Sequence, residues 1–318
     1  MGEKTAAYEQ AFANYIGTRY AVACNSGSSA NLLMVAAYTL RYGAGTVVVP
    51  AVAWSTSYSP FQQYGWKLVF LDIDRETLNY RPVDLWKASE IYDDPLILAV
   101  NLLGNPNHFN AFPRKCDILE DNCESLGAEY DGKKAGSFGL MASHSTFFSH
   151  HICTMEGGMV TTNNEWLYQA MLCLRSHGWT RHLPEKNVFG VKPGKFDFLF
   201  PGYNLRPTEV QSAIGISQLG KVDGFTEARR DNAKRFPLKT QKETGKSSWF
   251  GLTVFDSDVG RVSKVCETRP VVTGNFLRSP SIKYYDYEVF GKTPNADYIH
   301  ENACFIGNSH EMIDWSFL

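Results

Sequence analysis

The sequence lacks the features that mark membrane, secreted or nucleic-acid-binding proteins. No apolar stretch approaches the roughly 20 residues that a membrane-spanning helix needs, and residues 1–4 contain no apolar signal core. The seven cysteines are scattered and form no C-x-x-C pair, which argues against a disulfide framework or a zinc site. With a formal net charge of -2 and no long basic run, nucleic acid and acidic membranes are not expected partners. These absences predict a cytoplasmic protein with free thiols, no membrane segment and no metal.

What is present predicts an α/β fold. Short apolar runs bounded by Gly, Pro or Asp alternate with helical patterns, which is typical of a largely parallel sheet covered by helices. The expected strands are Tyr20–Cys24, 46–49, 68–72, 96–101 and 118–120. The expected helices cover about 29–41 and 208–222, with Thr208 as the N-cap of the second.

Length and polarity suggest two domains. The chain has 318 residues, of which 44% are hydrophobic, enough for one large domain and a smaller one. The sequence becomes polar around 239–246, and we place the transition shortly before this stretch. Residues 1–222 are therefore expected to form the large domain and residues 223–318 the small C-terminal domain.

Three polar or aromatic positions follow predicted strands, where α/β sheets place their ligands. The small-residue turn at 25–30 precedes a helix, whose free N–H groups could hold a phosphate, although an ordinary capped turn explains it as well. Asp121 could keep a cofactor pyridine nitrogen protonated, or serve only as a helix N-cap. Trp54 could stack on a flat ring or belong to the core.

The segment 145–158, with paired histidines before Glu156-Gly157-Gly158, is the most unusual in the chain. A metal site is disfavoured, because adjacent histidines on a strand point to opposite faces and no ligand stands at helical spacing. A buried core histidine is the other simple interpretation.

Taken in order, these motifs resemble the DegT/DnrJ/EryC1/StrS group of the aspartate-aminotransferase (fold type I) superfamily. The resemblance covers nearly the whole chain, from residues 2–9 to residues 295–302. It implies a three-layer α/β sandwich with a mainly parallel sheet and a smaller C-terminal α/β domain. It also implies the cofactor pair pyridoxal 5'-phosphate and pyridoxamine 5'-phosphate, and a homodimer with a composite active site.

The resemblance also assigns roles to individual residues. Gly27, Ser28, Ser29 and Ser145 correspond to phosphate-binding positions, and Asn204 to the asparagine that a dimer partner lends to the phosphate. Trp54 corresponds to the aromatic residue that stacks on the pyridine ring and Asp121 to the partner of its nitrogen. Glu124 stands near the cofactor face, where aminotransferase relatives usually have glutamine.

His150 lies five residues after Ser145, where the family's aminotransferases have the lysine that holds the cofactor. Within the family this change is the mark of the sugar 3-dehydratases, and the segments 101–106, 177–184 and 268–277 are most similar to those acting on GDP-4-keto-6-deoxy-D-mannose. The implied reaction removes the C3 hydroxyl of a nucleotide-linked 4-keto-6-deoxy sugar, with glutamate as amino donor. Histidine cannot hold the cofactor covalently, but it can move protons near neutral pH.

Two rival hypotheses stay open, a nucleotide-sugar aminotransferase and a catalytically inactive cofactor-binding homologue. Two features depart from the family pattern: relatives reach the opening motif only after a leading segment, and the stretch 235–249 is compressed. Both departures bear on full activity and neither on family membership. Arg181, Arg206 and Arg269 are candidate contacts for the diphosphate or sugar, because guanidinium groups match phosphate oxygens, or they form surface ion pairs.

Overall fold

The computed structural model describes residues 1–318 and is built around an eight-stranded sheet in the order β1-β9-β8-β5-β4-β2-β3-β12. Five neighbouring pairs, from β8 to β12 along this order, are parallel, whereas β9 runs antiparallel to both β1 and β8. Its strands are β1 Tyr20–Cys24, β2 Thr46–Pro50, β3 Lys67–Leu71, β4 Leu96–Val100, β5 Ile118–Asp121, β8 Met141–Ser145, β9 Gly158–Thr162 and β12 Tyr287–Val289. The mainly parallel sheet and all five expected strands are confirmed, with small differences at their ends.

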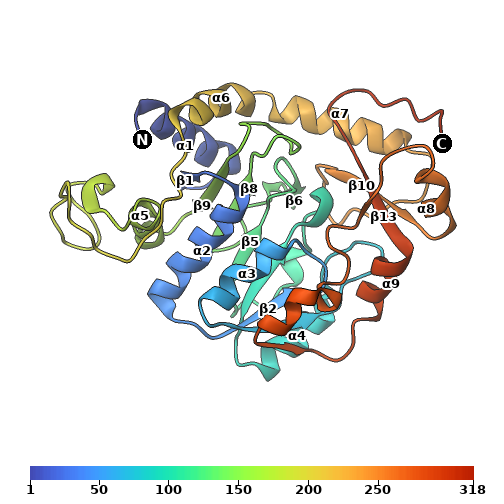
Figure 1. Cartoon of the computed structure of the whole chain (residues 1–318), viewed down its shortest axis with the longest axis horizontal. Coiled ribbons are helices and arrows are strands. Elements are labelled where there is room, and N and C mark those ends of the chain that lie inside the picture. Colours follow the sequence, from blue (N-terminus) through green and yellow to red (C-terminus); the bar gives the residue numbers. More distant parts are fainter.

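Helices cover both faces of this sheet because its strands are apolar on both sides. Within β2, Val47 and Val49 join the core under α2, α3 and α5, while Val48 joins the opposite core under α4. The helices of the chain are α1 Glu3–Ile16, α2 Gly27–Tyr42, α3 Ser55–Gln63, α4 Pro82–Ile91, α5 Glu165–Leu174, α6 Glu209–Leu219, α7 Val222–Arg235, α8 Ser257–Val262 and α9 Pro294–Asn302. The result is the expected three-layer arrangement (Figure 1). None of these helices combines the length and the apolar character needed to span a bilayer.

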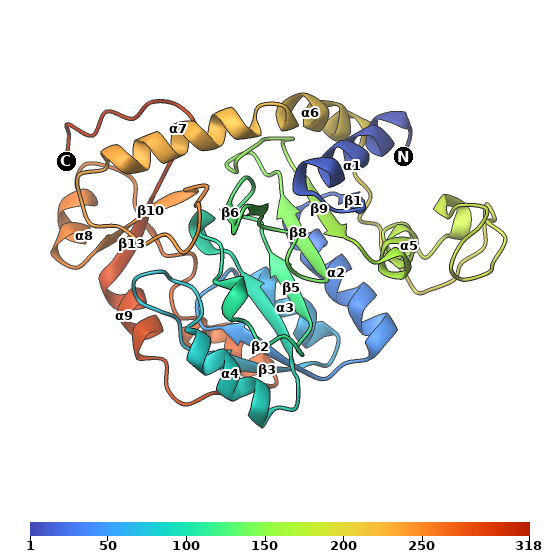
Figure 2. The same ribbon diagram turned by 180° about the vertical axis from the view of Figure 1, so that it is seen from behind.

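A second, three-stranded antiparallel sheet lies at the end of the molecule that holds the C-terminus. It has the order β10-β13-β11, and its strands are β10 Gly251–Phe255, β11 Arg269–Pro270 and β13 Ala303–Gly307. Figure 2 shows α6 and α7 running in line from the N-terminal helix to this sheet. Thr208 caps α6 in a capping box with Gln211, as its sequence predicts. Short strands β6 Glu129–Tyr130 and β7 Lys133–Lys134 form a separate hairpin.

The region after residue 222 does not fold entirely apart from the rest. It forms the three-stranded sheet, but β12 returns to pair with β3 at the edge of the large sheet. Phe276 and Ile299 also join the largest apolar core. The boundary between 1–222 and 223–318 therefore stays a prediction, and any small domain shares a core with the large one.

Candidate active site

The parallel strands β2, β5 and β8 end at one edge of the large sheet, and the predicted cofactor residues gather there. Asp121 is the last residue of β5, Ser145 is the last of β8, and Trp54 follows β2 as the N-cap of α3. Gly27 opens α2 directly against Ser145, since a Cβ atom at position 27 would lie 2.6 Å from the Ser145 Cβ. Four residues that are far apart in the sequence are thus brought to one place.

Hydrogen bonds fix the Asp121 carboxylate in a single orientation. Its Oδ2 accepts from Asn31 Nδ2 at 2.9 Å and from Ser57 Oγ at 2.6 Å, and its Oδ1 accepts from the Cys123 amide at 3.2 Å. The residue is only 5% exposed. Sequence reasoning missed Asn31 and Ser57. Asn31 could have been found as the single polar residue on the buried, apolar face of α2.

The start of α2 has the groups that bind an anion. Ser26 caps the helix, because its Oγ accepts from the Ser29 amide at 3.1 Å, and Ser28 Oγ contacts Thr56 Oγ1 at 2.8 Å. On the other side a Cβ at Gly158 would overlap with the Ser26 carbonyl. Free N–H groups, a helix dipole and hydroxyls in one place suit a phosphate group.

Glu124 lies near Asp121 and is bound to the main chain of another loop. Its Oε2 accepts from the Leu103 amide at 2.9 Å. Burial, together with the nearby charge of Asp121, raises the pKa of Glu124 to about 7. The carboxyl group can therefore exist in either protonation state at neutral pH.

The histidine pair lies in a loop, not on a strand. β8 ends at Ser145, and the His150 amide closes a turn onto the Phe147 carbonyl at 2.9 Å. Both imidazole rings contact Phe250, with centroid distances of 5.1 Å for His150 and 5.8 Å for His151. The expectation that the two rings point to opposite faces is therefore wrong, because the period-two rule applies only within a strand.

His150 is an uncharged base in this setting. Burial, together with the positive charge of Arg229, lowers the pKa of His150 to about 4, and Asp121 acts in the opposite direction. Its Nδ1 is buried and has no hydrogen-bond partner. No lysine occurs between Lys134 and Lys186, so this loop offers no amine that could bind a cofactor covalently.

The three arginines and Asn204 lie in two separate places. Arg181 and Arg206 lie over the Trp179 ring at 3.7 and 5.9 Å, and Arg206 Nε donates to Asn204 Oδ1 at 2.9 Å. They belong to the segment 177–206, which extends beside α5, on the side of the molecule away from the three-stranded sheet (Figures 1 and 2). These side-chain contacts stay within the segment, whose main chain meets the end of β1 where the Asn25 amide donates to the Leu205 carbonyl at 3.0 Å.

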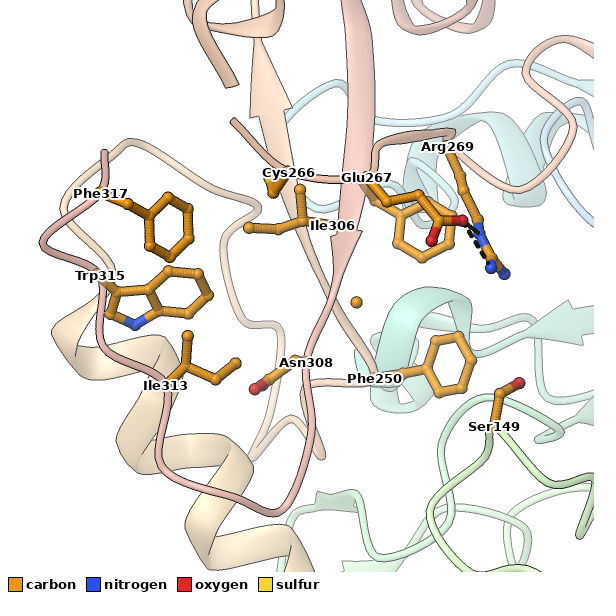
Figure 3. A pocket seen from close by; sticks show the side chains of 12 residues that line it. Ser149, Phe250, Cys266, Glu267, Arg269, Ile306, Asn308, Ile313, Trp315 and Phe317 are labelled. Carbon is orange, nitrogen blue, oxygen red and sulfur yellow. Dashed lines mark hydrogen bonds and ion pairs between the residues drawn. The ribbon is translucent and has the colours of Figure 1, made fainter. Parts of the chain in front are cut away.

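Arg269 is instead close to the histidine loop. It pairs with Glu267, with N–O distances of 3.0 and 2.9 Å, at the edge of a cavity of about 370 Å³. Figure 3 shows Ser149 and Phe250 on the same side of this cavity as Arg269. Ser149 directly precedes His150, so the cavity adjoins the loop that carries His150.

Comparison with known proteins agrees with this geometry. Residues 1–312 match the DegT/DnrJ/EryC1/StrS aminotransferase family. The chain belongs to this family. It is 47% identical to a GDP-4-keto-6-deoxy-D-mannose 3-dehydratase of Yersinia pseudotuberculosis, over 97% of this chain and 87% of the relative.

Solved structures of the same kind of enzyme have nearly the same fold. A GDP-4-keto-6-deoxymannose 3-dehydratase with a trapped PLP-glutamate geminal diamine superimposes with a TM-score of 0.93 at 43% identity, covering 100% of this chain and 91% of that one. A histidine-to-asparagine variant (ColD) with bound GDP-perosamine gives 0.91 at 44% identity, covering 98% and 90%. The predicted aspartate-aminotransferase type of fold is confirmed.

As a member of this aminotransferase family, the chain has a site that fits pyridoxal phosphate. The amides at the start of α2 and the hydroxyls around them suit the phosphate, and the Asp121 carboxylate suits a protonated pyridine nitrogen. Trp54 is 54% exposed at the same edge and offers a ring face for stacking. The departure from the family's aminotransferases is His150, at the position where the resemblance places the lysine.

Proposed function

We propose that this chain is a pyridoxamine 5'-phosphate-dependent 3-dehydratase that removes the C3 hydroxyl from GDP-4-keto-6-deoxy-D-mannose. The product would be a 3,6-dideoxy-4-keto sugar for surface polysaccharide. The observation that carries the proposal is the uncharged, half-buried His150 beside residues that suit the cofactor, in a loop without lysine. The relatives named above, which are dehydratases of this sugar, support the same conclusion.

The residues at the strand ends would hold the cofactor. Gly27, Ser28, Ser29 and Ser145 would bind its phosphate, Trp54 would stack on its ring, and Glu124 would lie near its face. When bound, the cofactor supplies an electron sink. Asp121 would keep the pyridine nitrogen protonated, and its three hydrogen bonds support that role by holding the carboxylate in place.

His150 would be the general base that takes and returns a proton during loss of the hydroxyl. A base must be uncharged before it acts, and the lowered pKa of His150 supplies that form at neutral pH. Glutamate would be the amino donor that restores the amine form of the cofactor, in agreement with the PLP-glutamate adduct of a relative. Charged substrates of this type and seven free cysteines fit a cytoplasmic location.

The sugar nucleotide would bind in the cavity that lies between the histidine loop and Arg269. We further propose a homodimer in which Asn204, Arg181 and Arg206 complete the site of the neighbouring subunit, because the family resemblance assigns Asn204 to the partner's phosphate and both arginines contact the same Trp179 ring in its segment. Exposed apolar side chains on the same segment support a covered surface: Phe196 is 71% exposed and Phe198 is 58% exposed.

Incubation with GDP-4-keto-6-deoxy-D-mannose, glutamate and pyridoxal phosphate tests the proposal. A dehydratase should release ammonia and a 3-deoxy sugar in equal amounts. An aminotransferase would form an amino sugar without free ammonia, and an inactive homologue would form neither product. Either of these results would overturn the proposal, provided that the protein binds the cofactor in the assay.

A further inference from the structure

The two ends of the loop that carries His150 are joined to each other, whereas its tip is held by another part of the chain. At the ends, the Thr146 amide donates to the Gly157 carbonyl and the Thr154 amide to the Thr146 carbonyl, both at 2.9 Å. At the tip, His151 Nε2 lies 3.2 Å from the carbonyl oxygen of Ser248, nearly a hundred residues later in the chain. The tip therefore depends on a contact with the C-terminal region.

His151 is well suited to make this contact. It is 2% exposed, and since a carbonyl oxygen can only accept, Nε2 must carry the proton. Burial, assisted by the charge of Arg229, holds the pKa of His151 well below its usual range. The ring is thus a neutral donor with a defined tautomer. Ser248 is fully buried and its carbonyl has no other hydrogen bond in the structure.

Ser248 is in turn fixed to the short turn Leu102–Gly104, which follows β4. Its amide donates to the Gly104 carbonyl at 2.9 Å, and the Phe250 amide donates to the Leu103 carbonyl at 3.1 Å. The segments 102–104 and 248–250 lie close together, since a Cβ at Gly104 would lie 2.5 Å from the Trp249 amide nitrogen. Leu103 also donates its amide to Glu124 near the cofactor site. His151 thus connects the loop to a rigid part of the site.

We propose that His151 is a positioning residue, whose Nε2–H bond to the Ser248 carbonyl holds the loop so that His150 keeps its place beside Phe250 and the strand ends. The proposal rests on the proposed function, because it takes His150 as the base. The two adjacent histidines then have different tasks: His150 moves the proton, and His151 fixes where His150 lies.

Two variants of His151 separate positioning from mere stability. His151→Gln keeps an amide donor at about the reach of Nε2, whereas His151→Leu removes the donor at similar volume. Val254→Ala in β10 is the control, because it creates a cavity in the small core without touching the loop. Melting temperature, cofactor affinity, KM and kcat are measured for each, together with ring ¹⁵N chemical shifts of the histidines in the sugar-free protein.

In the wild type we expect the ¹⁵N shifts of a neutral His151 protonated at Nε2. His151→Leu should lower kcat at least about tenfold, because a misplacement of about 1 Å can cost on the order of 10²-fold. Its KM and cofactor affinity should stay within about twofold, and the His150 shifts should change. His151→Gln should recover kcat to within about threefold, and Val254→Ala should keep kcat despite its lower melting temperature.

The proposal is overturned if His151 is charged or protonated at Nδ1, if His151→Leu keeps the kcat of Val254→Ala, or if a folded His151→Gln is as slow as His151→Leu. Should His151→Leu fail to fold, the kcat and shifts of His151→Gln decide alone. The shifts are measured without sugar, so they test His151 even if the wild type shows no dehydration. A wild type that binds the cofactor but shows no dehydration would refute the proposed function instead.

Discussion

The two halves of the site are built in different ways. At the strand ends, Asp121 receives three hydrogen bonds and Gly27 touches Ser145 directly. In the loop, the His150 ring has no hydrogen-bond partner at Nδ1 and lies against Phe250. One half is held by polar contacts around Asp121, while the other carries a histidine placed by contacts with the C-terminal region.

This difference suggests that binding and chemistry can be separated by mutation. The strand ends would hold the cofactor whether or not the loop carries a base, because none of the Asp121 hydrogen bonds involves the loop. Substitutions in the loop should therefore affect rate, and substitutions at the strand ends should affect cofactor affinity as well.

The largest expected effect is that of His150→Asn. Loss of a general base typically costs 10²–10⁴-fold in rate, and the phosphate and pyridine contacts are left in place. Dehydration should fall by about that factor with little change in cofactor affinity, measured by assay and by fluorescence titration. His150→Lys is the companion variant, and it should hold the cofactor covalently after borohydride treatment. Loss of cofactor binding in His150→Asn would contradict the separation of the two halves.

Gly158→Ala should damage the strand-end half. Gly158 pairs with both Cys24 and Ser145, and a methyl group there would meet the Ser26 carbonyl next to the phosphate cradle. We expect a loss of about 3 kcal/mol in the free energy of unfolding, at the upper end for overpacking, and weaker cofactor binding. Gly224→Ala in α7 is the control, because it has open space around it. It should stabilise the protein by roughly 0.5–1 kcal/mol. Equal effects of Gly158→Ala and Gly224→Ala on stability would argue against tight packing around the phosphate cradle.

Asp121→Asn removes a charge but keeps the shape of the side chain. Losing a charge-assisted hydrogen bond costs roughly 1.5–3 kcal/mol, so cofactor affinity should fall by about 10–150-fold. The rate at saturating cofactor should also fall, since the electron sink is weaker. An Asp121→Asn variant with unchanged dehydration would remove the assigned role. Ser57→Ala, which takes away one donor to the carboxylate, should give a smaller effect in the same direction.

The strand ends were also the part that could be predicted from sequence. Trp54 and Asp121 each come at the end of a short apolar run, and parallel strands bring such positions to one edge, whereas Ser145 ends the more polar strand Met141–Ser145 and was assigned by the family resemblance alone. The sequence can mark Asn31 as a polar residue on a buried helix face, but it does not show that Asn31 and Ser57 both face Asp121. Contacts of this kind depend on how α2 and α3 pack on the sheet.

The loop was predicted less well, for a physical reason. The spacing of five residues between Ser145 and His150 can be read from the sequence. The directions of the His150 and His151 side chains, however, depend on Phe250 and Ser248, about a hundred residues later in the chain. A local rule for strands gave the wrong orientation. The meeting of Arg269 with this loop across a cavity likewise required the three-dimensional structure.

The smallest expected effects concern the stability of the protein in acid. His144 and His150 allow the strand-end half and the loop half of the site to be compared in this respect. Burial lowers the pKa of His144 in β8 to about 3 and that of His150 in the loop to about 4. In the unfolded chain both would take up a proton near pH 6.5. Between pH 6.5 and 4 the unfolded state therefore binds more protons, and stability is lost as the pH falls. Glu124, with a raised pKa of about 7, acts in the opposite direction, so single variants are more informative than the total.

His144 and His150 should each contribute about 1.4 kcal/mol per pH unit to the slope of the free energy of unfolding against pH. Urea unfolding between pH 5 and 6 should therefore show a slope reduced by that amount in His144→Gln and again in His150→Asn. Thr161→Val is the control, because it removes a hydrogen-bond partner of His144 and lowers stability without removing the titrating ring. If the loop opens to water in mild acid, His150→Asn will reduce the slope less than His144→Gln, because an opened His150 would already be protonated in the folded state. Equal reductions would mean that the loop half is closed as firmly as the strand ends, and that the contacts of His151 and Phe250 are enough to exclude water.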